Sequence, residues 1–135
     1  MTYRIDAFAG KKIIGWKKAK RFDKRFNYYH VLIKLEISAR TRRVQPKDYK
    51  CRAASAKVLE ITTLKTTKLS KWDPKIREVG GRKVKFAHSS YDTKFRYDVG
   101  AIVKPKKKFD ADSWNECKSG IHFFLTEQEA KDYRV

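Results

Sequence analysis

An alternating run of apolar residues between positions 28 and 37 constrains the fold of this chain most strongly. The apolar positions recur at every second residue: Val31, Ile33, Leu35 and Ile37. Successive side chains of a β-strand point to opposite faces of a sheet, so the run predicts a strand with one buried face. Residues 53–61 alternate in the same way, and we expect them to form the partner of this strand.

The connection between the two predicted strands, residues 38–49, is rich in cations. It contains Pro46 and four basic residues, Arg40, Arg42, Arg43 and Lys47. Because proline and clustered charges favour a surface connection, we expect an exposed basic loop. A second turn signal follows at Gly80 and Gly81, which predicts a hairpin between residues 76–79 and 82–86.

The last third of the chain predicts further strands and one helix. Residues 95–99 and 101–103 have strand patterns and lead into a basic loop at residues 104–108. Residues 120–125 predict a buried strand, and a helix follows, because Thr126 and Glu129 have the spacing of a capping box. The predicted fold class is therefore α+β, a single β-rich domain with a C-terminal strand–helix unit.

Length and composition bound the number of domains and the location. With 135 residues, 41% of them hydrophobic, the chain can bury one ordinary core, so we expect one domain over residues 1–135. No apolar run approaches the roughly 20 residues that span a bilayer, and the N-terminus lacks a secretory apolar core. We therefore expect no membrane partner and no classical secretion. The two cysteines, Cys51 and Cys117, are too few for a disulfide framework and favour a reducing compartment.

The net charge of +19 is unevenly distributed along the chain. Residues 109–135 hold three basic and six acidic side chains, so this segment is mildly acidic and residues 1–108 are strongly basic. A soluble domain needs a net charge of only about 2–8 in magnitude, and a larger excess repels itself and destabilises the compact state. The charge therefore predicts a polyanionic partner, and nucleic acid is the first choice.

Clusters of cations in loops would supply the phosphate contacts, with little base specificity. Several clusters have an aromatic residue nearby: Trp16, Phe22, Phe26, Tyr28, Tyr49 and Phe109. Their rings could stack on exposed bases, but most large apolar side chains belong to the core, so we expect these aromatics to be core residues. The residues predicted to bind nucleic acid are Lys17, Lys18, Lys20, Arg21, Lys24, Arg25, Arg40, Arg42, Arg43, Lys104, Lys106, Lys107 and Lys108.

The sequence contains no strong catalytic or metal-binding motif. It has no P-loop, dinucleotide-binding turn or nucleophile elbow, and no closely paired cysteine or histidine ligands of the kind that zinc uses. Cys117 and His122 lie five positions apart and are conceivable as a nucleophilic pair. Together with Tyr91 they mark a candidate pocket. The sequence favours a protein without metal, cofactor or enzymatic activity.

The C-terminal segment has a recognisable signature. Residues 114–126 follow the pattern W-x-E-C-x-x-G-I-H-F-F-x-T, and the match extends to residues 15–18, 50–53, 89–92 and 95–100. The chain resembles a family of uncharacterised domains that occur in large DNA viruses and bacteriophages, sometimes fused to pentapeptide repeats. This resemblance implies a viral or viral-like origin, with the host cytoplasm or the virion as the location. It implies no particular activity.

A second likeness involves residues 120–124 together with Ala130 and Tyr133. They are similar to the G-[IL]-Y-F and A-x-x-Y elements of ADP-ribosyltransferases, which implies a fold of that kind and a site for a small nucleotide. The chain departs from that family at His122, which stands where a tyrosine is usual, and it lacks the H-G-T or H-G-S element. The likeness therefore implies a degenerate member.

Three functions stay open from the sequence. The first is a non-enzymatic viral or phage accessory protein that binds nucleic acid through its phosphates. The second is a structural virion protein, either minor capsid or packaged, whose basic face meets acidic virion proteins or the genome. The third is a nucleotide-binding or degenerate ADP-ribosyltransferase-like protein. The sequence does not distinguish DNA from RNA and does not predict an oligomeric state.

Overall fold

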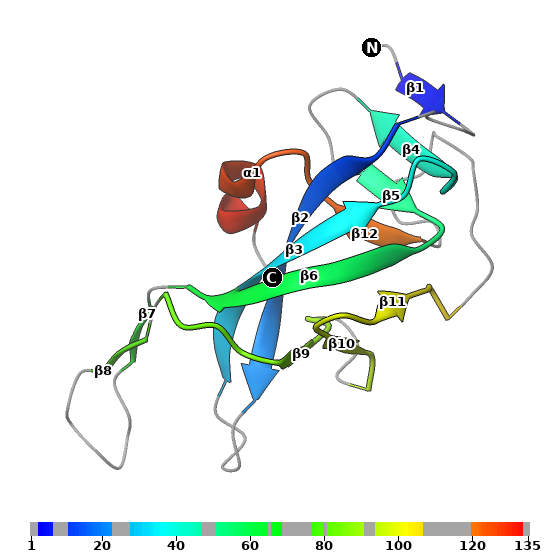
Figure 1. Cartoon of the computed structure of the whole chain (residues 1–135). Helices are drawn as coiled ribbons and strands as arrows, with labels where there is room; N and C mark the ends of the chain where they lie inside the picture. Colours follow the sequence, from blue (N-terminus) through cyan, green and yellow to red (C-terminus); the bar gives the residue numbers. More distant parts are fainter. Residues whose placement is uncertain are drawn as a thin grey trace.

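The protein is mostly β-structure with one short helix (Figure 1). The computed structural model describes residues 3–6, 11–22, 28–46, 51–64, 66–68, 77–79, 81–90, 94–106 and 120–133. The described strands form antiparallel sheets of six, four and two strands. The expectation of a small β-rich domain is confirmed, but the helical part of the predicted α+β class amounts to a single six-residue helix among the described residues.

The long central strands belong to the six-stranded sheet. Strand β2 (Ile13–Phe22) pairs with β3 (Tyr28–Ile37) along its whole length, and β3 pairs on its other side with β6 (Ala56–Thr63). This confirms the strand predicted at residues 28–37 and its partner from Ala56 on, whereas Ala53, the first residue of the predicted partner, lies in another sheet. Three short strands complete the order β10-β9-β2-β3-β6-β11, namely β9 (Phe86–His88), β10 (Arg96–Asp98) and β11 (Ile102–Val103).

The core lies on one face of this sheet, where the odd-numbered residues of β3 from Val31 to Ile37 are fully buried. The simple alternation expected across β6 is wrong, because the register shifts: Lys34 pairs with Glu60, whereas Leu35 pairs with Val58. Leu59 is the extra residue of this β-bulge. A bulge sets two residues of one strand against one of its partner, and here it lets both Val58 and Ile61 reach the buried face.

The four-stranded sheet has the order β1-β4-β5-β12. Its strands are β1 (Tyr3–Asp6), β4 (Arg43–Pro46), β5 (Cys51–Ala53) and β12 (Ile121–Phe123). Two backbone hydrogen bonds between Trp16 and Phe124, 2.8 and 2.7 Å long, join it to β2. The prediction of an exposed loop at residues 38–49 is wrong for residues 43–46, because they form strand β4. Arg43 is only 1% exposed there, and residues 47–50 lie outside the described residues.

The predicted hairpin around Gly80 and Gly81 is also wrong in its pairing. Strand β8 (Arg77–Val79) pairs with β7 (Thr66–Lys68), not with the residues after the turn. The segment after the turn lies along the end of β6 instead: the Gly81 amide donates to the Thr63 carbonyl (2.9 Å), and a β-bridge follows between Thr62 and Lys83. Gly81 adopts φ +73°, a conformation that glycine reaches without strain.

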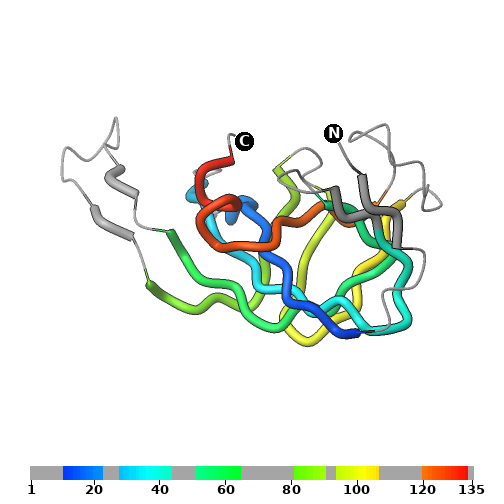
Figure 2. Tube along the Cα trace, turned by 90° about the horizontal axis from the view of Figure 1, so that it is seen from above, coloured from blue at the N-terminus to red at the C-terminus, as the bar shows by residue number. Residues whose placement is uncertain are grey.

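The C-terminal elements follow the sequence prediction. Strand β12 leads into helix α1 (Glu127–Asp132). The Thr126 hydroxyl accepts a hydrogen bond from the Glu129 amide (3.2 Å) and donates one to the Glu129 carboxylate (2.8 Å). This confirms Thr126 as the N-cap and Glu129 as its partner, although the carboxylate meets the Thr126 hydroxyl and not the backbone amide that would complete a capping box. The helix lies on one side of the curved layer formed by β2, β3 and β6 (Figure 2). Among the described residues, no helix is long and apolar enough to cross a membrane.

Candidate nucleic-acid interface

Five rings gather at one end of the six-stranded sheet and form an aromatic cluster, which we define as Phe22, Tyr28, His30, Phe86 and His88. The strand register brings them together. Phe22 on β2 is directly opposite Tyr28 on β3. Lys20, two residues earlier, is opposite His30 on one side and opposite His88 of β9 on the other. Three strands thus contribute to one surface.

The rings of the cluster contact one another at an angle. The ring centroid of Phe22 lies 5.7 Å from that of Tyr28 and 5.6 Å from that of His88, and the two pairs of ring planes are inclined by 55° and 66°. Tyr28 meets His30 edge-on at 5.8 Å, with an angle of 74°. Tilted and edge-to-face contacts are the arrangements that aromatic pairs prefer. Tyr28 is 44% exposed, whereas Phe22, His30, Phe86 and His88 are partly buried.

Three cations surround these rings. The Lys20 ammonium lies 4.4 Å from the centroid of Tyr28. The guanidinium carbons of Arg21 and Arg96 lie 3.5 and 3.7 Å from the centroid of Phe86. Two guanidinium groups that close to one centroid would overlap on the same side, so they lie on opposite faces of the ring. Cation–π attraction of this kind holds the charges at the cluster.

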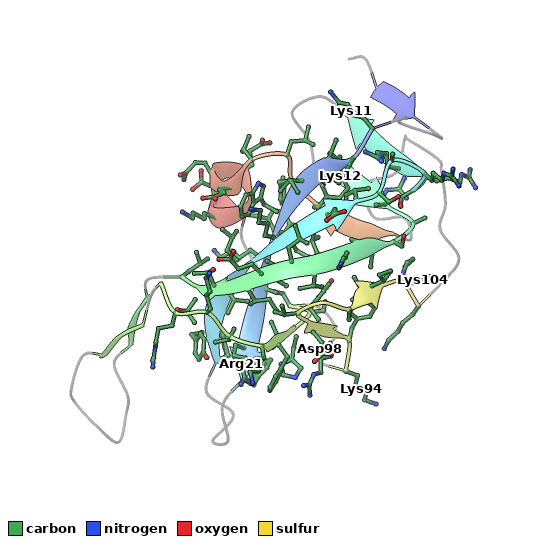
Figure 3. All side chains as sticks on the ribbon, viewed as in Figure 1. Lys11, Lys12, Arg21, Lys94, Asp98 and Lys104 are labelled. Carbon is green, nitrogen blue, oxygen red and sulfur yellow. The ribbon has the colours of Figure 1, made fainter. Side chains whose placement is uncertain are left out.

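The cations of the cluster are poorly neutralised. Arg96 donates to Asp98 at 2.9 Å, and both side chains are about half exposed. Neither Lys20 nor Arg21 forms an ion pair within the described part of the chain. Figure 3 shows Arg21 near Asp98 and Lys94 at one end of the sheet, far from Lys11 and Lys12 at the other. This end of the sheet therefore offers positive charge to an anion.

The environment of His88 favours the uncharged form of its imidazole. Burial lowers its pKa below the usual 6.5, and the nearby Arg21 and Arg96 charges lower it further, while Asp98 acts weakly in the opposite direction. Its Nδ1 atom is buried and has no hydrogen-bond partner among the described residues. A neutral imidazole between Phe22 and Phe86 behaves as one more aromatic ring of the cluster.

Several residues predicted to bind phosphate have structural partners. Lys17 lies on β2, not in a loop, and donates to the His122 carbonyl at 3.1 Å. Lys18 donates to the Lys131 and Tyr133 carbonyls (3.1 and 3.3 Å), at the C-terminal end of helix α1. A cation is favourable at that end of a helix. Arg43 donates to the Thr41 and Ser38 carbonyls, at 3.3 and 2.5 Å, and its guanidinium is buried.

The remaining predicted residues do not share one surface. Lys20 and Arg21 lie at the aromatic cluster. Arg40 and Arg42 are exposed in the turn after β3, which is the opposite end of that strand from Tyr28. Lys104 and Lys106 are exposed after β11. The predicted residues outside the described part of the chain are Lys24, Arg25, Lys107 and Lys108.

The candidate pocket of Tyr91, Cys117 and His122 is represented in the described structure by His122 alone. This histidine is half-buried on β12, where it pairs in register with Arg52. Within the described ranges, no group of three or more His, Cys, Asp or Glu side chains could hold a metal ion. The other cysteine, Cys51, is a buried thiol whose pKa is raised to about 12, chiefly by burial. Such a thiol is a poor nucleophile.

Sequence reasoning missed His30, Phe86, His88 and Arg96 as members of the site. Strand β9 joins β2 through the pairing of Lys20 with His88. These residues are far apart in the sequence, and a local pattern does not predict which distant strands will pair. A groove of about 420 Å³ was missed for the same reason. The groove lies beside α1, on the face of the six-stranded sheet that also carries the aromatic cluster, and Trp16 and Leu32 are among its lining residues.

Comparison with known proteins places the chain in a family. No solved structure matches it. It is similar to uncharacterized protein L227 of Acanthamoeba polyphaga mimivirus, with 31% identity over 114 residues that cover 79% of this chain and 62% of the relative. The chain thus spans less than two thirds of that protein. A viral relative of this kind agrees with the expectation of an uncharacterised viral domain. Because residues 3–130 match its family model, the chain belongs to DUF5758, a family of unknown function.

Proposed function

We propose that this protein is a non-enzymatic accessory protein that binds nucleic acid through its phosphates. The observation that carries the proposal is the set of cations at the aromatic cluster. Lys20, Arg21 and Arg96 converge on one end of the sheet. Phosphate contacts by Lys and Arg supply most of the affinity of sequence-independent nucleic-acid binding, because they release condensed counterions.

The charge of the whole chain supports the same proposal. A net charge of +19 far exceeds the magnitude of about 2–8 that solubility requires. Several cations are held by backbone carbonyls inside the fold, as Lys17, Lys18 and Arg43 are. At the cluster, Arg21 donates to the Phe22 carbonyl at 3.2 Å and Arg96 pairs with Asp98, but neither Lys20 nor Arg21 forms an ion pair within the described residues. A polyanion that docks there would relieve the self-repulsion of the basic surface.

A structural role in the virion is the second candidate, and the similarity to a mimivirus protein favours it. In that role the same basic surface would meet the packaged genome or acidic virion proteins. The small-nucleotide function implied by the likeness to ADP-ribosyltransferases has no comparable support. It stays a prediction that depends on Tyr91 and Cys117, outside the described residues.

The test is a salt series with two charge-matched variants. Lys20→Gln, Arg21→Gln and Arg96→Gln together remove three cations at the cluster. Lys11→Gln, Lys12→Gln and Lys57→Gln together remove three exposed cations elsewhere. Binding of labelled DNA and RNA strands and of DNA duplex is measured as salt rises from about 50 to about 200 mM.

We expect the logarithm of the wild-type affinity to fall linearly with the logarithm of the salt concentration. For duplex, the slope should decrease by about 0.9 for each phosphate that the cluster variant no longer neutralises. The control variant, with the same net charge, should keep the wild-type slope. An equal weakening in both variants would place the interface elsewhere, and salt-insensitive binding or no binding at low salt would overturn the proposal.

A further inference from the structure

We infer that the aromatic cluster stacks on unpaired bases, so that the target of this protein is a single-stranded nucleic acid. The inference rests on the proposed function, because it specifies the form of nucleic acid that the same site binds. Phosphate contacts alone do not distinguish a single strand from a duplex. Accessible rings do, because bases in a duplex are already stacked on one another.

The first step is the accessibility of a ring. Tyr28 is the exposed aromatic ring of the cluster, at 44%. Its ring neighbours, Phe22 and His30, are inclined to it by 55° and 74°, so neither is stacked parallel on it. The Lys20 ammonium lies over one face of the ring, so a base would stack on the other face. Stacking of a base on an exposed aromatic ring contributes about 1–3 kcal/mol, and every base has a face that can stack.

The second step is the placement of charge relative to the rings. Lys20 lies over Tyr28, and Arg21 and Arg96 flank Phe86. Both faces of Phe86 are therefore occupied by guanidinium groups, whereas Tyr28 has a cation on one face only, and cations lie next to rings on β2, β3, β9 and β10. A nucleic-acid strand alternates phosphates with bases, so this arrangement matches an unpaired strand in both its charge and its apolar component.

The third step is the platform itself. The cluster is carried by paired strands of a sheet, and the Phe22–Tyr28 and Lys20–His30 pairs fix its geometry. Aromatic residues on a sheet surface are an established way to bind splayed single-stranded bases. Two residues beyond His30 on β3, Leu32 lines the groove beside α1.

The experiment compares three oligonucleotides of one length: a thymidine strand, an abasic strand with the same number of phosphates, and a duplex. Wild-type protein is compared with Tyr28→Ala, Tyr28→Phe and the control Ile102→Ala. Ile102 is 66% exposed and lies on the edge strand β11, away from the cluster. An oligouridine strand is included to compare RNA with DNA.

We expect wild-type protein to bind the thymidine strand more tightly than the abasic strand or the duplex. Tyr28→Ala should weaken binding of the thymidine strand by roughly 5- to 100-fold, the range that the loss of one stacked base implies. The same variant should leave the abasic strand and the duplex unaffected. Tyr28→Phe should retain wild-type affinity because it keeps the ring, and Ile102→Ala should change nothing.

Ultraviolet cross-linking provides a measurement that does not depend on a variant. A strand that contains 4-thiothymidine should cross-link to peptides that carry Phe22, Tyr28 or Phe86. Cross-links confined to other peptides would overturn the inference. Equal, salt-sensitive binding of all three oligonucleotides, unchanged in Tyr28→Ala, would also overturn it while leaving the proposed function intact. No binding of any oligonucleotide at low salt would overturn both.

Discussion

The pKa of His88 is set by groups from several strands of the sheet. Burial comes first, since it disfavours the charged imidazolium, and the positive charges of Arg21 and Arg96 act in the same direction. The carboxylate of Asp98 opposes them weakly. The lowered pKa couples the protonation of one ring to folding and to the charge at the proposed interface.

We predict that the stability of the folded protein falls as the pH drops below about 6.5. The folded-state pKa of His88 is lowered, so the unfolded chain takes up this proton first. The contribution is fully present above the unfolded pKa and is lost as the pH falls toward the folded pKa. Urea unfolding at several pH values should show a steeper loss in wild type than in His88→Phe, which keeps a ring but cannot titrate. Parallel pH profiles of the two proteins would contradict this.

The same prediction has a spectroscopic form. The imidazole resonances of His88, assigned by their disappearance in His88→Phe, should titrate below pH 6.5 in the free protein. A bound oligonucleotide brings phosphate charge near the ring, so the pKa should rise in the complex. An unchanged pKa on binding would mean that the phosphates do not reach the cluster.

Individual cations show why the site could be predicted only in part. The basic run at residues 17–21 correctly draws attention to Lys20 and Arg21. Composition cannot reveal that Lys18, two residues before Lys20, is bound by carbonyls at the end of α1. Nor can it reveal that Arg43 is buried against carbonyls of its own turn. Charge counts identify the sign of a partner, whereas the fold decides which charges are available to it.

Among the elements, prediction succeeded where the pattern was local. Strand β3 and helix α1 were predicted well, because period-two burial and the spacing of a capping box are readable within a few residues. The segment after Gly81 was misassigned because a glycine pair indicates a reversal of the chain and not the strand that pairs next. Here the end of β6 provides that partner. The bulge at Leu59 depends on the register with β3, which no single strand encodes.

The junction between β2 and β12 depends on Gly15. A Cβ atom at this position would lie 2.5 Å from Cδ2 of Phe123, which is fully buried. We predict that Gly15→Ala destabilises the protein by about 1–3 kcal/mol, the usual cost of overpacking a core. Chemical denaturation of the variant measures this destabilisation.

A double-mutant cycle identifies the cause of that destabilisation. Phe123→Leu alone should also destabilise the protein, because it removes buried volume. If the clash with Phe123 is responsible, the double variant should be more stable than the sum of the two single effects implies. Strictly additive effects would show that Gly15 is required for another reason.

At the scale of the whole molecule, the charge distribution connects stability with binding. Residues 1–108 carry the basic excess, whereas residues 109–135 are mildly acidic. The surface ion pairs Lys83–Glu60 and Lys131–Glu127 are long, at 3.8 Å, and largely exposed. Such pairs contribute little, so they cannot offset the self-repulsion of a chain with a net charge of +19.

We predict that two kinds of screening raise the melting temperature of the protein from its low-salt value. Added salt should raise it by weakening repulsion between cations. A thymidine oligonucleotide at low salt should raise it by several degrees, since a ligand at 100 times its Kd stabilises the folded state by about 2.7 kcal/mol. That second increase should fade at high salt, as phosphate contacts weaken. It should also be smaller in the Lys20, Arg21 and Arg96 variant than in its charge-matched control. A melting temperature that falls steadily with added salt would mean that attractive ion pairs, rather than repulsion, dominate the surface, and the argument from net charge to a polyanionic partner would then fail.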